Sequence, residues 1–261
     1  MENGFEYGGF YFEKYVDDSW DSLQLKLWRH SIVDGSAPEY EPEYALCLDR
    51  CEEPSFPNLI IPSYIDGMPV KEIGFAAFYQ NETLCSISIP NTVTLIGREA
   101  FTNCYSLENI ELPDCVTQIE RDAFSHCTSL KSAKLSNALK SLPAQLFKDC
   151  ESLQSIYIPD DIENINMNTF YGCVKMETVH LPNNLKSIET GAFFNCKSLR
   201  EVNIPDHIEF IGKSVFFRCE NVSHVRFSKA LVDRPDADEI FNQLFKAGLR
   251  TREVLLKIPT L

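Results

Sequence analysis

A unit of 23 residues repeats six times without a break between Leu84 and Asn221, and this period constrains the fold more than any other feature of the sequence. Two invariant columns run through the six units. They are Phe101, Phe124, Phe147, Phe170, Phe193 and Phe216, and Cys104, Cys127, Cys150, Cys173, Cys196 and Cys219. A period in the twenties predicts a solenoid, in which each unit buries its apolar face only against its neighbours.

Each unit begins with a short alternating stretch. In the second unit this stretch contains Ile110 and Leu112, which predicts a strand whose alternate side chains face inward. Pro113 ends the strand, because proline cannot donate a hydrogen bond to the next rung. A second extended segment follows around Val116 and Ile119, and the Ala-Phe-x-x-Cys segment then turns the chain back. One unit has too few apolar residues to fold alone, so we expect stability only from a stack.

The pattern continues past both ends of the six units. Residues 56–83 form a further unit with five additional residues in a turn between Tyr64 and Pro69, and Val225 lies in one last strand. The third unit is irregular. It has Ala133 where the others have Ile or Val, Ser136 where they have Pro, and Pro143 where they have Gly or a polar residue. We therefore predict leucine-rich repeats over residues 56–229, an N-terminal cap over 1–55 and a C-terminal cap over 230–261.

The two ends of a solenoid expose unpaired strand edges and an open core, so caps are expected. Residues 10–15 and 23–28 have strand character, 34–42 form a polar loop, and 44–48 lead into the first unit. Past residue 233 an acidic segment with a proline predicts the start of a helix over about 236–247. The tail from Val254 to Pro259 either closes the core as a strand, which we favour, or docks on a partner.

The sequence resembles the BspA-like, or Treponema pallidum type, leucine-rich repeat proteins. The resemblance depends on Ile-Pro after the first strand, on Ile-Gly at Ile96-Gly97 and Ile211-Gly212, and on Ala-Phe-x-x-Cys. It covers roughly residues 45–229. It implies a mainly β, curved solenoid with a parallel sheet on its concave face. It also implies adhesion or protein recognition, often by proteins on bacterial or protozoan surfaces.

The charge of the chain limits its partners. The net charge is −14, and residues 1–55 contain 13 acidic and 4 basic residues. Phosphate recognition requires a basic footprint, so we expect no nucleic-acid partner. No apolar run approaches the length of a membrane span. The N-terminus lacks the basic start and apolar core of a signal peptide, which leaves a cytoplasmic location or a trimmed secreted or cell-surface chain.

The ten cysteines and five histidines do not form an expected reactive centre. Neighbouring thiols of one repeat column point in parallel directions, which does not suit the crossed geometry of a disulfide. We interpret them as buried thiols, with pairing of Cys47 with Cys51, or of Cys85 or Cys115 with another thiol, as alternatives. No phosphate loop, metal-ligand spacing or nucleophile motif is present, so we expect no catalytic residues, no metal and no cofactor.

Side chains that face outward from the first strands are the best functional candidates. Three exposed columns vary while the buried columns repeat, as expected of a surface that is free of packing constraints. The middle column predicts a ligand-binding row on the concave face, formed by Glu111, Lys134, Tyr157, His180, Asn203 and Arg226. Tyr and Arg often anchor protein interfaces. The alternative interpretation is an ordinary solvated sheet face.

Three functions are consistent with these patterns. The first is a non-catalytic recognition or adhesion module that binds a protein, a peptide or a glycan on the concave sheet, with a host or cell-surface protein as a candidate partner. The second is a structural or assembly protein that associates through its caps or its C-terminal tail. The third, an enzyme with a site near the N-terminal cap, is disfavoured because no set of acid, base and nucleophile is present.

Overall fold

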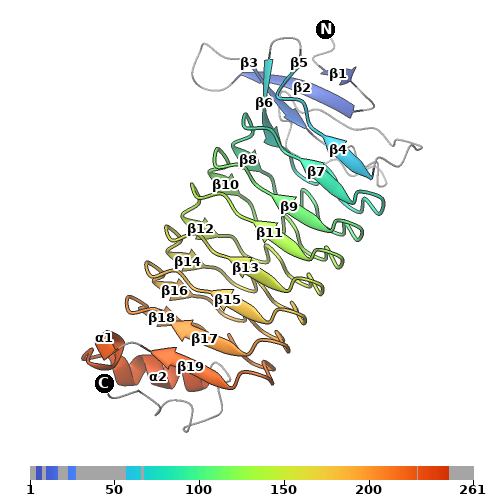
Figure 1. Cartoon of the computed structure of the whole chain (residues 1–261). Coiled ribbons are helices and arrows are strands. Elements are labelled where there is room, and N and C mark those ends of the chain that lie inside the picture. Colours follow the sequence, from blue (N-terminus) through green and yellow to red (C-terminus); the bar gives the residue numbers. More distant parts are fainter. Residues whose placement is uncertain are drawn as a thin grey trace, which may run out of the picture.

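The computed structural model describes residues 4–7, 10–16, 23–27, 57–65, 68–227 and 229–246. Figure 1 shows a stack of similar turns, with strands β1–β3 at one end and helices α1 and α2 at the other. The predicted loop at 34–42, the segment 44–48, Cys47, Cys51 and the tail at 254–259 lie outside the described residues. The division into a repeat region and two caps therefore stays a prediction.

The first strands of the repeats lie side by side along the stack (Figure 1). They are β4 (Asn58–Ile60), β7 (Ser86–Ser88), β9 (Asn109–Glu111), β11 (Ser132–Lys134), β13 (Ser155–Tyr157), β15 (Thr178–His180), β17 (Glu201–Ile204) and β19 (His224–Phe227). Strands β9 to β19 form a 6-stranded parallel sheet, and β4 pairs with β7. Ala133 is aligned with Ile110 and Ile156, a shift of one repeat. This register brings the predicted inward residues into one buried column.

The second strands form another layer of the stack. They are β6 (Met68–Ile73), β8 (Leu95–Ile96), β10 (Gln118–Ile119), β12 (Ser141–Leu142), β14 (Asn164–Ile165), β16 (Ser187–Ile188) and β18 (Phe210–Ile211). The described strands of this layer separate between β10 and β12. In other repeats the residue after the second strand donates its N–H to the preceding repeat, as Asn166 does to the Leu142 carbonyl at 3.1 Å. Pro143 has no N–H to donate, which explains the break.

The turns between second and first strands contain two left-handed positions in each repeat. Examples are Glu99 and Asn103, with φ of 57° and 62°. At the second position Asn, Asp, His and Gly predominate, which are the residues that tolerate this conformation best. The conformation directs an N–H along the stack, so that the Asn103 N–H donates to the Ser125 carbonyl at 3.0 Å. The turns are thus joined by their own ladder of hydrogen bonds, although they are not regular strands.

The phenylalanine and cysteine columns fill the centre of the stack. The phenylalanine rings, extended by Phe78, are buried and stacked with centroids 5.0–5.8 Å apart. Each thiol of the cysteine column donates to the carbonyl of a phenylalanine 26 residues earlier, at 3.0–3.2 Å. The cysteines among the described residues, Cys85 and Cys115 included, form no disulfide. The interpretation of the column as buried thiols that make hydrogen bonds is therefore confirmed.

The N-terminal strands continue the second-strand layer. Strands β1 (Gly4–Tyr7), β2 (Phe10–Val16) and β3 (Leu23–Leu27) pair antiparallel with one another, and β3 pairs parallel with β6. The strands expected at 10–15 and 23–28 are thus present. At the expected turn between Tyr64 and Pro69, β5 (Tyr64–Ile65) pairs antiparallel with the start of β6.

Two helices follow the last repeat. Helix α1 spans Lys229–Val232, which the sequence did not predict, and α2 spans Ala237–Lys246, one residue shorter at each end than the prediction. Ile240 and Leu244 join the hydrophobic core, and the Gln243 Oε1 accepts the Ile211 N–H at 2.7 Å. Helix α2 therefore packs against β18 at the end of the stack. Among the described residues, no helix has the length and apolar character needed to cross a bilayer.

Candidate recognition surface

The exposed side chains of β7 to β19, together with the residue before each strand, form a surface that we call the first-strand face. It is the face that the sequence analysis expected to carry the ligand-binding row. The strands position their side chains because successive residues alternate between the core and the solvent. Within β13, for example, Ile156 is buried whereas Ser155 and Tyr157 are exposed. Each repeat therefore adds a similar set of three outward positions to this face.

All six predicted ligand-binding residues are exposed on the first-strand face. They are Glu111 on β9, Lys134 on β11, Tyr157 on β13, His180 on β15, Asn203 on β17 and Arg226 on β19. Strand register makes Lys134 the neighbour of both Glu111 and Tyr157, and aligns Tyr157 with His180 and Asn203 with Arg226. The structure thus brings the six residues into one row. Their role in binding stays a proposal.

The row divides into three parts according to its contacts. Lys134 forms an ion pair with Glu111, which raises the pKa of the Lys134 ammonium. Tyr157 and His180 stack with ring centroids 5.8 Å apart and nearly parallel planes. The Arg226 side chain contacts the neighbouring column of the face, because its Nε lies 2.9 Å from a carboxylate oxygen of Glu201. The two ends of the row therefore carry charged side chains that form ion pairs, whereas its centre contains no Asp, Glu, Lys or Arg.

The other charges of the first-strand face are paired in the same way. Lys131 lies 2.9 Å from Glu108, and Arg200 lies 3.3 Å from Glu177, each measured between nitrogen and carboxylate oxygen. Together with the pairs in the row, the four acidic and four basic residues of the three outward columns cancel, when histidine is neutral. Exposed ion pairs of this kind stabilise the fold little. Their main effect is electrostatic, because they leave this face neutral on a strongly acidic protein.

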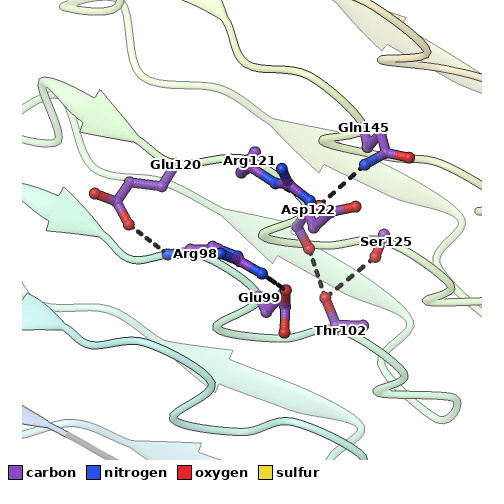
Figure 2. Close-up of polar contacts among 8 residues, drawn as sticks. All are labelled: Arg98, Glu99, Thr102, Glu120, Arg121, Asp122, Ser125 and Gln145. Atoms are coloured by element: carbon purple, nitrogen blue, oxygen red, sulfur yellow. Dashed lines mark hydrogen bonds and ion pairs between the residues drawn. The ribbon is translucent and has the colours of Figure 1, made fainter. Parts of the chain in front are cut away.

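A polar network on the turns, which sequence reasoning missed, lies away from the first-strand face (Figure 2). The Asp122 carboxylate accepts from the Arg121 Nε at 3.0 Å and from the Gln145 Nε2 at 3.1 Å, and Glu120 accepts the Arg98 N–H at 2.7 Å. Asp122 and Gln145 both occupy left-handed turn positions. Because its charges have partners within the network, we interpret it as support for the turns.

A second aromatic ladder was also missed. Tyr171, Phe194 and Phe217 stack with centroids 4.7 and 5.5 Å apart, and Arg218 lies over the Phe194 ring at 6.0 Å. The signal in the sequence was a 23-residue spacing of aromatic residues that begins only in the later repeats. The ladder is half-buried and lies beside the buried phenylalanine column.

The described residues contain no group of three or more His, Cys, Asp or Glu side chains suited to a metal ion. Burial raises the pKa of the buried thiols, as for Cys127, Cys150 and Cys173. These thiols are therefore protonated at neutral pH, which is the form that donates to the phenylalanine carbonyls and the form that makes a poor nucleophile. Their role is structural.

A stack of parallel strands with uniform buried columns and a variable exposed face defines a β-solenoid repeat protein. The sequence matches the family described as the BspA type leucine rich repeat region, with 6 copies over residues 51–177 and 140–242. The chain belongs to this family of leucine-rich repeat proteins, as the resemblance in the sequence indicated. The family is not known for enzymes, and its repeats suggest protein interaction or adhesion. No curated protein matches the chain.

Solved structures of bacterial leucine-rich repeat proteins are similar to this chain. The Treponema pallidum leucine-rich repeat protein has 26% identity and a TM-score of 0.70, with 94% of this chain and 96% of that chain covered. A leucine-rich cell surface protein of Faecalibacterium prausnitzii has 25% identity and a TM-score of 0.65, with 86% and 54% covered. A leucine-rich repeat protein of Eubacterium ventriosum has 28% identity and a TM-score of 0.55, with 68% and 50% covered. The chain thus spans about half the length of the latter two proteins.

Proposed function

We propose that this protein is a non-catalytic recognition module, and that it binds its partner, a protein at a cell surface or its attached groups, on the first-strand face. The observation that carries the proposal is the contrast between columns. Positions that face the core repeat with little change, whereas the outward positions of the same strands differ from rung to rung. Because the outward positions are free of packing constraints, each rung can carry a different side chain for contact with a partner.

The centre of this face has the composition of an interface anchor. Tyr157 is 56% exposed and is the large hydrophobic residue of the row, and it stacks on His180. Tyrosine is enriched among residues that dominate binding energy, since it contributes apolar area and a hydroxyl while losing little conformational freedom. The neutral charge of the face also spares a partner from the repulsion that the net charge of −14 would otherwise impose on acidic ligands.

A pull-down with cell-surface extract tests the proposal. We compare the intact protein with a triple variant, Tyr157→Ala, His180→Ala and Arg226→Ala. A matched control changes the same residue types away from the face, as Tyr105→Ala, His207→Ala and Arg121→Ala. All six positions are exposed, so both variants should keep the fold, which circular dichroism verifies.

The proposal expects a partner that the intact protein and the control retain and the triple variant loses. Retention by the triple variant would instead favour the second function, assembly through the ends of the chain. In that case removal of residues 250–261 should alter complex formation more than changes on the first-strand face. If no protein is retained specifically, the recognition function is refuted.

A further inference from the structure

The uncharged centre of the first-strand face contains a cluster of side chains with unused hydrogen-bonding capacity. This cluster, which we call the neutral centre because it contains no Asp, Glu, Lys or Arg, consists of six exposed residues on β13, β15 and β17 or directly before β13: Gln154, Ser155, Tyr157, Thr178, His180 and Asn203. Among the described residues, the side chains of these six make no hydrogen bond or ion pair with one another or with their neighbours. The aromatic contact within the cluster is the stack of Tyr157 on His180.

The charged side chains around the neutral centre, by contrast, have partners. On one side Lys131 and Lys134 are held by carboxylates on β9 and directly before it, and on the other side Arg200 and Arg226 are held by Glu177 and Glu201. A serine hydroxyl nearby also has a partner, since the Ser132 Oγ donates to the amide oxygen Oδ1 of Asn109 at 2.7 Å. The polar side chains that remain for a ligand are therefore the hydroxyl, amide and imidazole groups of the neutral centre.

The chemistry of these groups selects the class of ligand. Amides, hydroxyls and a neutral imidazole both donate and accept hydrogen bonds, so they match a ligand that does the same. A charged ligand would find no opposite charge without breaking an ion pair. Tyr157 is the one large apolar residue of the six, so the apolar anchors of a protein partner would bury little apolar surface on this cluster. A sugar chain offers many hydroxyls, and its C–H groups pack on aromatic rings.

We propose that the neutral centre recognises an uncharged saccharide chain carried by a cell-surface glycoprotein. The proposal rests on the proposed function, because it names the group that the first-strand face binds. The Tyr157–His180 stack provides an aromatic surface for a sugar. The imidazole face turned away from Tyr157 lies on the side of Asn203, where no described aromatic ring covers it. The amides of Gln154 and Asn203 and the hydroxyls of Ser155 and Thr178 surround that aromatic surface. A site built to bind hydroxyl groups discriminates strongly against ligands that lack them.

Binding to an array of defined oligosaccharides tests the proposal directly. The array contains neutral oligosaccharides and matched sialylated and sulfated ones. We compare the intact protein with Tyr157→Ala, with the double variant Thr178→Ala and Asn203→Ala, and with Tyr105→Ala as the matched control. Tyr105 is also an exposed tyrosine, at 40%, but it lies in a turn outside the first-strand face. Equal melting temperatures verify that each variant is folded.

We expect neutral oligosaccharides to bind, with a loss of about tenfold in affinity for Tyr157→Ala and none for Tyr105→Ala. Salt should change the affinity less than about twofold, because the charges beside the site are already paired. Binding only of acidic oligosaccharides, or binding that Tyr157→Ala leaves intact, overturns the proposal. So does the absence of binding to every oligosaccharide on the array.

A second arm separates this proposal from the proposed function. The cell-surface extract is treated with periodate, which cleaves sugar diols and leaves most protein surfaces intact, before the pull-down is repeated. Capture that depends on Tyr157 and disappears after periodate supports saccharide recognition. Capture that depends on Tyr157 and survives periodate refutes the saccharide while the recognition function stands. If the triple variant captures the same proteins as the intact protein from both extracts, both proposals fail.

Discussion

The buried phenylalanine column makes a quantitative prediction about how the stack is held together. Phe147 is fully buried and stacks on Phe124 at 5.7 Å and on Phe170 at 5.8 Å. Phe216 is equally buried but has one stacked neighbour, Phe193, at 5.6 Å. Truncation of these two rings to alanine therefore removes similar apolar areas but a different number of ring contacts. The difference in their effects measures what stacking contributes.

The magnitudes follow from area and contacts. Removing a buried phenyl ring takes away about 150 Å² of apolar burial, or about 4 kcal/mol at ~25 cal/mol per Å². Each stacked pair adds about 0.5–1.5 kcal/mol. We expect Phe147→Ala to lower the free energy of unfolding by about 5 kcal/mol, the upper end for such changes, and Phe216→Ala by about 1 kcal/mol less. Phe217→Ala, at a residue 39% exposed, should have a smaller effect than either.

Urea denaturation followed by far-ultraviolet circular dichroism measures these values. Because each repeat contacts only its neighbours, Phe147→Ala weakens the middle of the stack. We therefore expect the unfolding transition to broaden as well as to shift to lower urea concentration. The end variant Phe216→Ala should shift the transition with less broadening. Equal costs for the two buried positions, or costs below about 2 kcal/mol, would refute the idea that the column acts as a continuous ladder.

Three further predictions concern the turns, the thiols and the last helix. The cysteine column should resist N-ethylmaleimide in the native protein at pH 8 and react in denaturant, as mass spectrometry of labelled peptides would reveal, and rapid native labelling would contradict the inferred burial. Ser214→Gly relieves a left-handed φ of 55° and should raise the free energy of unfolding by about 0.5 kcal/mol in urea titrations. Gly212→Ala places a methyl group 2.4 Å from a backbone nitrogen and should lower the free energy of unfolding by about 1–3 kcal/mol; the reverse order of stability would count against both assignments. Arg234 lowers the pKa of Asp236, so the stabilisation from this pair is complete above the ordinary pKa of 3.8 and is lost as the pH falls through the lowered pKa of the folded state. The melting temperatures of the wild type and Asp236→Asn should therefore differ at pH 7 and converge in acid, and a difference that is independent of pH would refute the ionic contribution.

The sequence predicted the parts of this fold that depend on one-dimensional periodicity. The phenylalanine and cysteine columns, the register of the first strands and the outward direction of Tyr157 all follow from a spacing of 23 residues. The left-handed turns did not follow, because residues such as Glu99 and Gln145 carry no signature of that conformation. There the repeat-to-repeat hydrogen bonds override local preference.

The candidate site was predicted as a row but not as a pattern of pairs. A column identifies neighbours across one rung, and this accounts for the pairing of Glu111 with Lys134. It does not identify diagonal contacts, which depend on side-chain rotamers, so the pairing of Arg226 with Glu201 was missed. The neutral centre could not be predicted from the columns either, because its definition depends on which charged side chains around it form ion pairs in the structure.

The constant thiol-to-carbonyl separation of 26 residues has a consequence for how such a protein changes over generations. Each thiol reaches back to the repeat before it, so a duplicated or deleted block of 23 residues re-creates the same bonds at the new junction. Unequal recombination between repeats would thus lengthen or shorten the molecule without a folding defect, and each added rung would bring three new outward positions. The length of the first-strand face would then differ between related proteins, while the fold of each repeat stays the same.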